Sequence, residues 1–218
     1  MATVRRVPSF AEEKRFQAQG YRYIAGVDEV GRGALAGPVF AAAVILPSGF
    51  RAPWLKLVRD SKLLTPQRRD ELFPHIQWGA VAVGVGSADC ATIDDIGIAP
   101  ATRLAMKRAV EALDPPADAL LIDYFTLREV GLPQKGVIDG DTLCYSIACA
   151  SIMAKVTRDR LMADLDREYP GYLFARHKGY GTEEHIECLR RLGPSPVHRR
   201  NFQPVRESLD LGLPEDGG

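Results

Sequence analysis

The sequence is poor in the features that mark secreted, membrane-spanning or nucleic-acid-coating proteins. Its four cysteines, Cys90, Cys144, Cys149 and Cys188, form no C-x-x-C pair and no zinc-binding spacing. Nothing at the N-terminus resembles a secretory leader, so we expect a protein of the reducing cytoplasm. The formal net charge is +0, which argues against non-specific coating of nucleic acid.

The longest uncharged stretch, residues 33–50, is about as long as a membrane span. Glycine and proline interrupt it at Gly37, Pro38, Pro47 and Gly49. We therefore predict a buried β-hairpin there and no contact with a membrane. The sequence also lacks internal repeats and low-complexity segments.

The chain has the composition of an ordinary globular protein, with 218 residues of which 46% are hydrophobic and 26% charged. This length can bury a sizeable core, and we expect one domain. The predicted boundaries are an N-terminal lead-in over residues 1–20, the domain over 21–211 and a tail over 212–218. Within the lead-in, Ser9 is expected to cap a helix over Phe10–Gln19.

Five segments have the β-branched, apolar composition of strands. They are Tyr23–Val30, Val39–Leu46, Trp78–Ser87, Ala119–Asp123 and a short strand around Val137. The first three are predicted to form a meander. Helical spacing predicts helices over Pro66–Ile76, Ile98–Leu113, Cys144–Glu168, Thr182–Leu192 and Pro204–Leu211. This order indicates an α/β fold with a mixed five-stranded sheet flanked by helices and a helical C-terminal layer.

Acidic residues stand at the ends of three of these apolar runs. Asp28 and Glu29 end the first strand, Asp123 ends A-L-L-I-D, and Asp141 ends V-I-D-G-D. Neighbours on a regular strand point to opposite faces, so Asp28 and Glu29 can share a site only if the strand bends or ends there. The glycines that follow would permit this bend.

Four carboxylates brought together would repel one another, and divalent cations relieve such repulsion. Oxygen ligands without cysteine or histidine favour Mg²⁺ or Mn²⁺ over zinc. A single strand-end acid is more often a cap or an ion-pair partner, so the metal site rests on the set rather than on any one residue.

Basic residues outnumber acidic ones between Arg176 and Arg206, where His177, His185 and His198 also lie. This region is a candidate face for a nucleic-acid backbone. A solvated helical surface would explain the same charges equally well.

The chain resembles the ribonuclease HII family, the bacterial type 2 ribonucleases H, from Tyr23 to about Val205. Seven motifs occur in the family's order. They are D-E-V-G-R-G at 28–33, D-S-K-L-L at 60–64, L-I-D at 121–123, G-D at 140–141, S-I-A-C-A-S-I-M-A-K-V-T-R-D at 146–159, H-K-G-Y at 177–180 and H-R-R-N-F-Q-P-V at 198–205.

The resemblance implies a ribonuclease H-like fold and a metal-dependent endonuclease with two Mg²⁺ or Mn²⁺ ions. Its catalytic and metal-binding acids would be Asp28, Glu29, Asp123 and Asp141. The substrates would be RNA–DNA hybrids and DNA duplexes containing single ribonucleotides, cut to leave 5′-phosphate and 3′-hydroxyl ends. We expect a monomer.

Further residues match substrate-binding positions of that family. The backbone of Gly31, Arg32 and Gly33 would read 2′-hydroxyl groups, which distinguish RNA from DNA. Tyr180 would stack on the deoxyribose after the ribonucleotide. The same resemblance places two more residues near substrate phosphates, namely Ser61 and Lys62.

Two arginines, Arg158 and Arg199, are weaker candidates, suited to phosphate contacts or to structural ion pairs. Another acidic pair, Asp94 and Asp95, is expected to cap the helix that starts near Ile98.

The chain departs from the family pattern at Asp139, where many members have lysine. If that segment is extended, Asp139 and Asp141 point to the same face and would strengthen metal binding or favour Mn²⁺.

Three other functions remain open from the residues alone. They are an inactive nucleic-acid-binding module, another ribonuclease H-like nuclease such as a junction resolvase or transposase, and a structural domain.

Overall fold

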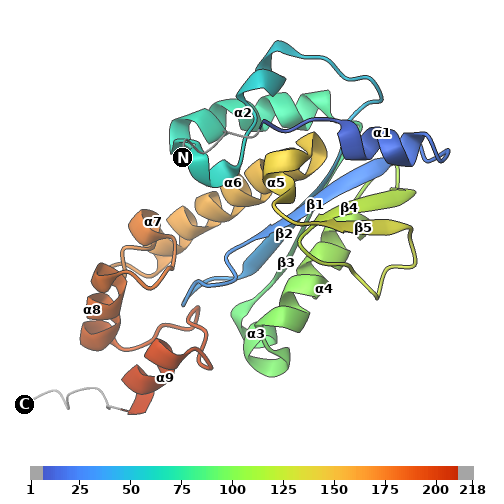
Figure 1. Cartoon of the computed structure of the whole chain (residues 1–218). Coiled ribbons are helices and arrows are strands. Elements are labelled where there is room, and N and C mark those ends of the chain that lie inside the picture. Colours follow the sequence, from blue (N-terminus) through green and yellow to red (C-terminus); the bar gives the residue numbers. More distant parts are fainter. Residues whose placement is uncertain (1–6, 211–218) are drawn as a thin grey trace, which may run out of the picture. The chain divides into compact units, whose positions relative to one another are not determined.

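The computed structural model describes residues 7–210 and contains a five-stranded sheet (Figure 1). The strand order is β3-β2-β1-β4-β5. Strand β1 pairs antiparallel with β2 and parallel with β4, and β4 pairs parallel with β5. The expected mixed five-stranded sheet is therefore confirmed.

The strands occupy five short segments of the chain. Their bounds are β1 Ile24–Val30, β2 Val39–Ile45, β3 Ala82–Ala88, β4 Ala119–Asp123 and β5 Gln134–Val137. Within the predicted hairpin of residues 33–50 only one strand, β2, is found, so that prediction was wrong in extent. The hairpin partner of β2 is β1, and the turn between them starts at Gly31, whose φ is +88°.

Nine α-helices and two 3₁₀ helices lie within residues 7–210. The α-helices are α1 Ala11–Gln17, α2 Pro66–Gly79, α3 Cys90–Ile96, α4 Ile98–Glu111, α5 Gly140–Leu143, α6 Tyr145–Glu168, α7 Phe174–His177, α8 Glu183–Leu192 and α9 Gln203–Asp210. The 3₁₀ helices are η1 Pro53–Leu57 and η2 Ser61–Leu63. All the predicted helices are present, whereas the short α3, α5, α7, η1 and η2 were not foreseen.

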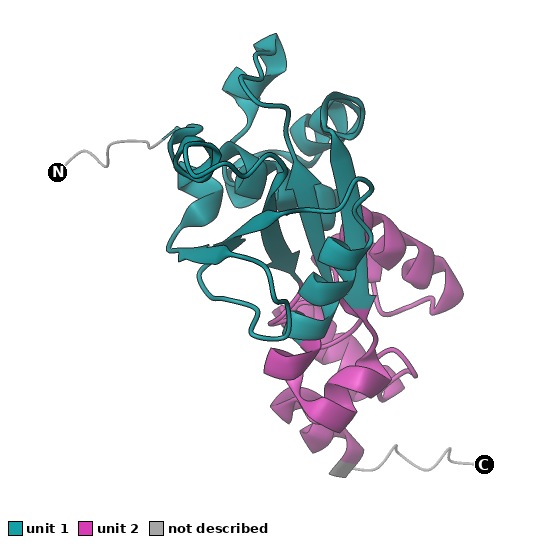
Figure 2. Cartoon of the chain, turned by 90° about the vertical axis from the view of Figure 1, so that its right-hand side faces the viewer, with its two compact units in different colours: residues 1–30, 40–87, 102–156 teal, residues 31–39, 88–101, 157–218 magenta. Residues whose placement is uncertain are grey.

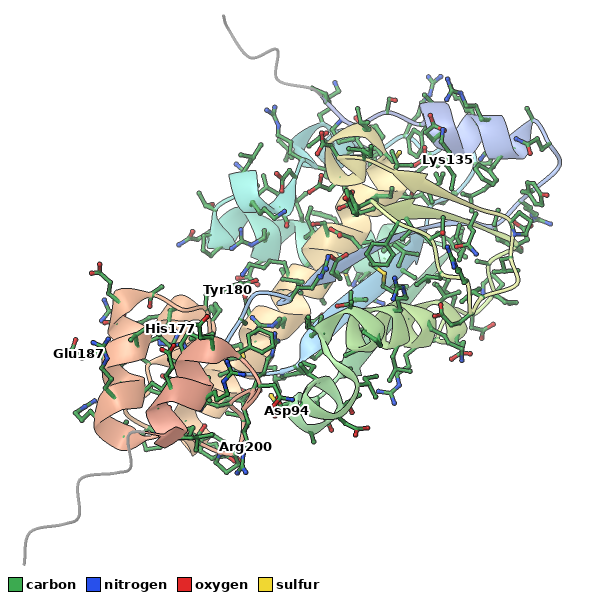
Figure 3. All side chains as sticks on the ribbon, turned by 60° about the horizontal axis from the view of Figure 1, so that its bottom comes forward. Asp94, Lys135, His177, Tyr180, Glu187 and Arg200 are labelled. Atoms are coloured by element: carbon green, nitrogen blue, oxygen red, sulfur yellow. The ribbon has the colours of Figure 1, made fainter. Side chains whose placement is uncertain are left out.

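Three local predictions need correction. Helix α1 begins at Ala11 after the N-cap Phe10, one residue beyond the expected start. Helix α2 runs on through Trp78 to Gly79, so β3 begins only at Ala82. Asp94 lies inside α3 and does not cap α4. Its carboxylate accepts the backbone N–H groups of Arg200 and Asn201 instead (Figure 3).

Two faces of β3 are covered by different helices. Val83 and Val85 pack on the core cluster that includes buried residues of α2 and α6. The alternate positions Gly84 and Gly86 lie against the backbone of α4. Because successive strand residues point to opposite faces, α4 and the α2–α6 pair cover opposite sides of the sheet.

Helix α6 also packs directly on the centre of the sheet. A Cβ atom on Gly26 of β1 would lie 2.1 Å from the carbonyl carbon of Ser146 and 2.3 Å from the nitrogen of Ile147. Backbone cannot yield as a flexible side chain can. Glycine at position 26 is therefore what allows α6 to approach β1 and to bring Ser151 toward the strand end.

The chain divides into two compact units, each built from several stretches of sequence (Figure 2). Unit 1 comprises residues 1–30, 40–87 and 102–156 and contains most of the sheet. Unit 2 comprises residues 31–39, 88–101 and 157–218 and contains α7, α8 and α9. The single domain expected over 21–211 draws on both units and stays a prediction, and the expected tail lies outside the described residues.

The helices of the described part of the chain are all too short or too polar to cross a bilayer.

We predict that Gly26→Ala destabilises the protein by about 3 kcal/mol, the upper part of the range for overpacking, because the new methyl group meets backbone. Urea unfolding should show a lower midpoint. The control is Gly131→Ala, where nothing lies within 4 Å of the added atom. Equal midpoints for the two variants would contradict the close packing of β1 and α6.

Candidate active site

The parallel pairing of β1 with β4 brings two of the predicted acids together in unit 1. Val27 is paired with Ile122, so the next residues, Asp28 and Asp123, emerge side by side at the same end of the two strands. Asp28 is buried, and Asp123 is partly buried. The local cause is the apolar composition of both strands, which keeps them in the centre of the sheet up to these carboxylates.

The sequence suggested that β1 bends or ends at Asp28 and Glu29, but the strand does neither. Its pairing with β2 continues through Val30 and Phe40, and the turn comes only at Gly31. The two acids therefore occupy successive positions of a regular strand. They are still close enough for the charge of Glu29 to act on Asp28.

Asp141 comes from the first turn of α5 and is buried. The preceding Asp139 has a left-handed backbone, with φ 54°, and its own carbonyl accepts the N–H of Thr142. This turn is tied to β4 because the Gly140 N–H donates to Asp123 Oδ1 at 2.7 Å. The segment is therefore not extended, and the premise that Asp139 and Asp141 share one face of a strand was wrong.

The acids shift one another's protonation. Burial, with the charges of Glu29 and Asp123, raises the pKa of Asp28 well above its usual value. Burial, with the charges of Asp60 and Asp123, raises the pKa of Asp141 to about 6. The pKa of Asp123 is raised as well, chiefly by burial, although the Gly140 N–H opposes this. Asp139 contributes here, since its charge adds to the rise at Asp123.

Asp60 is an acid of this cluster that the sequence analysis did not select. Its carboxylate hydrogen-bonds Asp141 and also caps η2 by accepting the Lys62 N–H at 2.9 Å. Its only signal in the sequence is its place at the head of D-S-K-L-L. The neighbouring Lys62 lies close enough to the acids for their charges to act on it, and its expected phosphate contact stays a prediction. Burial would lower its pKa, but Asp141, Asp60 and Asp28 together raise it.

Ser61 is buried and is linked to Asp28 through a second serine. Its hydroxyl lies 2.9 Å from that of Ser151 on α6, and the Ser151 side chain hydrogen-bonds Asp28. Arg69 holds the same loop through bonds from Nη1 to the carbonyls of Ser61 and Leu64, at 2.7 and 2.6 Å. Through these contacts Ser61 helps to hold Ser151, and thereby Asp28, in place. Its expected contact with a substrate phosphate stays a prediction.

The donor set of unit 1 fits a hard divalent cation. It consists of carboxylate oxygens, with no thiol or imidazole among them. Burial, followed by the charges of neighbouring acids, raises the pKa of Asp28, Asp123 and Asp141. Within residues 7–210, however, no three acidic, histidine or cysteine side chains are placed so that they could hold a metal ion together. Repulsion between neighbouring carboxylates opposes such a placement.

In unit 2, the glycine-rich segment of residues 31–38 is held by two buried arginines. Arg199 donates to the carbonyls of Gly31, Arg32 and Gly37 at 2.7–2.9 Å. Arg158 donates to those of Ala36, Pro38 and Lys178 at 2.8–3.1 Å. Both guanidinium groups thus bind backbone carbonyls, which is neither of the two roles considered from the sequence.

The two glycines of G-R-G differ in what surrounds them. A Cβ on Gly31 would come within 2.2 Å of Arg158 Nε, and its φ is +88°, so packing and turn geometry both require glycine there. Gly33 has nothing within 4 Å of an added Cβ. Only Gly33 therefore has the open surroundings expected of a backbone that a sugar can approach.

Tyr180 lies next to this segment within unit 2. Its backbone pairs with Ala34, and the Arg158 guanidinium lies 5.5 Å from the centre of its ring. The ring is partly exposed, as substrate stacking would require. The side chain is labelled in Figure 3 beside His177.

A chain of buried histidines ends on the Tyr180 carbonyl. The Ser195 N–H donates to His198 Nδ1, so a neutral His198 carries its proton on Nε2 and donates to His185 Nε2, 3.1 Å away. His185 then donates from Nδ1 to the Tyr180 carbonyl at 2.9 Å. Burial lowers the pKa of His185 to about 4, which keeps this ring neutral.

The basic region around these histidines was a candidate backbone-binding face, and that expectation fails for its most suggestive members. His177, His185, His198 and Arg199 are all buried. Burial against aromatic rings and carbonyls, rather than a solvated surface, is the reason these residues occur together.

Comparison with known proteins shows which family the chain is similar to. A sequence model described as ribonuclease HII matches residues 25–205. The ribonuclease HII of Dehalococcoides mccartyi is 58% identical over 203 residues, which cover 93% of this chain and 96% of the relative.

Solved structures share the fold at lower identity. The ribonuclease HII in a complex with PCNA from Archaeoglobus fulgidus has a TM-score of 0.70 and 24% identity, covering 83% of this chain and 95% of that one. A Bst ribonuclease HIII in complex with Mn²⁺ has a TM-score of 0.66 and 20% identity, covering 87% of this chain and 70% of that one. From the sequence match and the shared fold we conclude that the chain belongs to the ribonuclease HII family of metal-dependent nucleases.

Proposed function

We propose that this protein hydrolyses the RNA strand of RNA–DNA hybrids and cuts on the 5′ side of single ribonucleotides in duplex DNA. Divalent cations, Mg²⁺ or Mn²⁺, would be held by Asp28, Glu29, Asp123 and Asp141. The observation that carries this proposal is the cluster of acids in unit 1 that the β1–β4 register and the bond from Gly140 to Asp123 bring together. A role in ribonucleotide removal during DNA repair and replication follows from the chemistry.

Three of the four acids have a defined structural basis for their place in such a site, and Glu29 acts on Asp28 through its charge from the next position of β1. Asp28 and Asp123 are set by the register of β1 and β4, and Asp141 by the turn bonded to Asp123. Held by these acids, two divalent ions would supply activation of the attacking water and stabilisation of the leaving oxygen. Lys62 adds a cation beside the carboxylates and is suited to a substrate phosphate.

Recognition of the ribonucleotide would fall to unit 2. The open surroundings of Gly33 favour a close approach of its backbone to a 2′-hydroxyl group. Tyr180, supported by Arg158 and the histidine chain, is suited to stack on the adjacent sugar. The bonds that Arg199 makes to the G-R-G carbonyls would keep this segment in one conformation.

The first experiment is cleavage of a DNA duplex carrying one ribonucleotide, beside an all-DNA duplex, with Mg²⁺, with Mn²⁺ and with a chelator. Metal-dependent cutting 5′ of the ribonucleotide alone would support the proposal. An inert protein that still binds hybrid would instead favour the inactive binding module.

We predict that Asp123→Asn abolishes cleavage while hybrid binding and folding persist. The substitution removes charge from the centre of the acid cluster but keeps a side-chain oxygen to accept the Gly140 N–H. Gel-based cleavage and a filter-binding assay would measure the two properties. The control is Glu129→Gln, an exposed acid of the loop after β4. Wild-type turnover in Asp123→Asn would refute the site.

We predict that Tyr180→Ala lowers the preference for a single embedded ribonucleotide over a long hybrid by about tenfold, because stacking of an aromatic ring contributes about 1–3 kcal/mol. The ratio of kcat/KM on the two substrates is the measurement. Equal losses on both would argue against stacking at the junction.

We predict that metal affinity falls as the pH drops through about 6, the pKa of Asp141. An acid whose pKa is raised on folding stabilises the folded protein at low pH, and this contribution is lost as the pH rises through that pKa. Metal binding requires the ionised form, so protons compete with it. Mn²⁺ should therefore raise the thermal unfolding midpoint at about pH 8 and barely at about pH 5. A shift of the same size at both values would count against a carboxylate site.

A further inference from the structure

Three exposed apolar residues directly adjoin residues of the acid cluster of unit 1, or its neighbour Lys62, in the sequence. Tyr124 is 71% exposed and follows Asp123, Ile138 is 69% exposed and precedes Asp139, and Leu63 is 72% exposed and follows Lys62. Large exposed apolar groups that gather at one place mark binding surfaces more often than isolated ones do. These three residues contribute little to the core, so burial in the fold does not explain them.

The backbone of Tyr124 is strained in addition. Its φ is 67°, in the left-handed region, where a bulky residue is a genuine outlier. The conformation is imposed by neighbours, because the Tyr124 N–H donates to the Val137 carbonyl at 2.9 Å. On the same side, a Cβ on Gly136 would approach the carbonyls of Tyr124 and Phe125 to 3.1 and 3.0 Å.

Strain of this kind persists where the surrounding structure holds it, and it collects at functional sites. Glycine or asparagine would fit position 124 with less strain, and an exposed ring brings no packing energy in return. An outlier that is both strained and exposed therefore needs a reason outside the folded chain itself.

We propose that Tyr124 packs its ring against the sugars of the nucleic-acid duplex beside the cut, and so is a substrate-binding residue of unit 1. The inference rests on the proposed function. A strand whose phosphate reaches Asp123 comes close to Tyr124, the next residue of the chain, whose side chain is exposed. Sugar rings present apolar C–H faces, and tyrosine combines an apolar ring with a polar tip. Ile138 follows Val137, whose carbonyl accepts the Tyr124 N–H, and it would extend the same surface.

A nucleic acid fits this surface better than a protein partner does. The apolar residues stand among the carboxylates and Lys62, and those groups have to remain open to the strand being cut. A protein seated on Tyr124 would cover them. Continuity with the acid cluster therefore selects the duplex as the occupant.

The test compares Tyr124→Gly, Tyr124→Phe and Trp78→Ala, with cleavage of an RNA–DNA hybrid and urea unfolding as readouts. Trp78 is the matched control because its side chain is aromatic and 87% exposed. It lies in α2, which supplies none of the acids of the cluster. We expect Tyr124→Gly to raise KM about tenfold, with kcat changed much less, since stacking energy would be lost on binding. Its urea midpoint should equal or exceed that of the wild type, because strain is relieved. Trp78→Ala should keep the wild-type KM, and Tyr124→Phe, which retains the ring, should show a much smaller rise in KM than Tyr124→Gly.

An unchanged KM in Tyr124→Gly overturns the inference, and so does an equal rise in Trp78→Ala. If the wild type self-associates and Tyr124→Gly abolishes this association without changing KM, the surface binds a second copy of the chain. That result would also overturn the inference. Failure of the proposed function is distinct, because the wild-type protein would then not cut hybrid or ribonucleotide-containing duplex at all.

Discussion

The parallel pairing of β1 with β4 is the constraint on which the acid cluster depends. It joins segments almost one hundred residues apart in sequence and sets Asp28 beside Asp123. Gly26 permits the α6 backbone to lie on the same strand, which places Ser151 near Asp28. The Asp123 carboxylate then fixes the turn that presents Asp141. One register thus orders carboxylates from three elements.

Placing these groups together has an electrostatic consequence. Each carboxylate is partly desolvated and faces others of the same charge, so the protonated form is favoured beyond its usual range. Lys62 offsets part of this charge, whereas the charge of Asp60 adds to the rise in the pKa of Asp141. The fold therefore holds a cluster that a divalent cation would stabilise, and this is the physical link between the sheet and the family's chemistry.

Unit 2 solves a different problem, which is to hold an irregular, glycine-rich segment in one conformation. It does so with donors from buried side chains rather than with a sheet. Arg158 and Arg199 satisfy the carbonyls of residues 31–38, and the histidine chain satisfies the carbonyl of Tyr180. These cations are buried with their charge spread over several carbonyl dipoles, and burial lowers the pKa of Arg199 to about 10.

Much of this protein could be predicted from its sequence, because apolar periodicity and capping act locally. The apolar run A-L-L-I-D indicated β4 with its bounds, and Thr65 with Pro66 indicated the start of α2. The four acids and the G-R-G segment could be selected as well, since strand-end carboxylates and ordered motifs are visible in one dimension.

Other features depend on contacts between distant residues, and only the tertiary structure decided them. Whether Asp139 lies on a strand or in a left-handed turn depends on the bond between Gly140 and Asp123, seventeen positions apart. The burial of Arg199 and of the three histidines depends on loops that meet only in the folded chain, so charged residue types there suggested a surface. Asp60 and Tyr124 gain their places beside the acids in the same way. Sequence by itself determined the elements and the chemistry available at their ends, because those follow from neighbouring residues. Register, burial and turn geometry determined which of those groups meet, because these arise from long-range pairing.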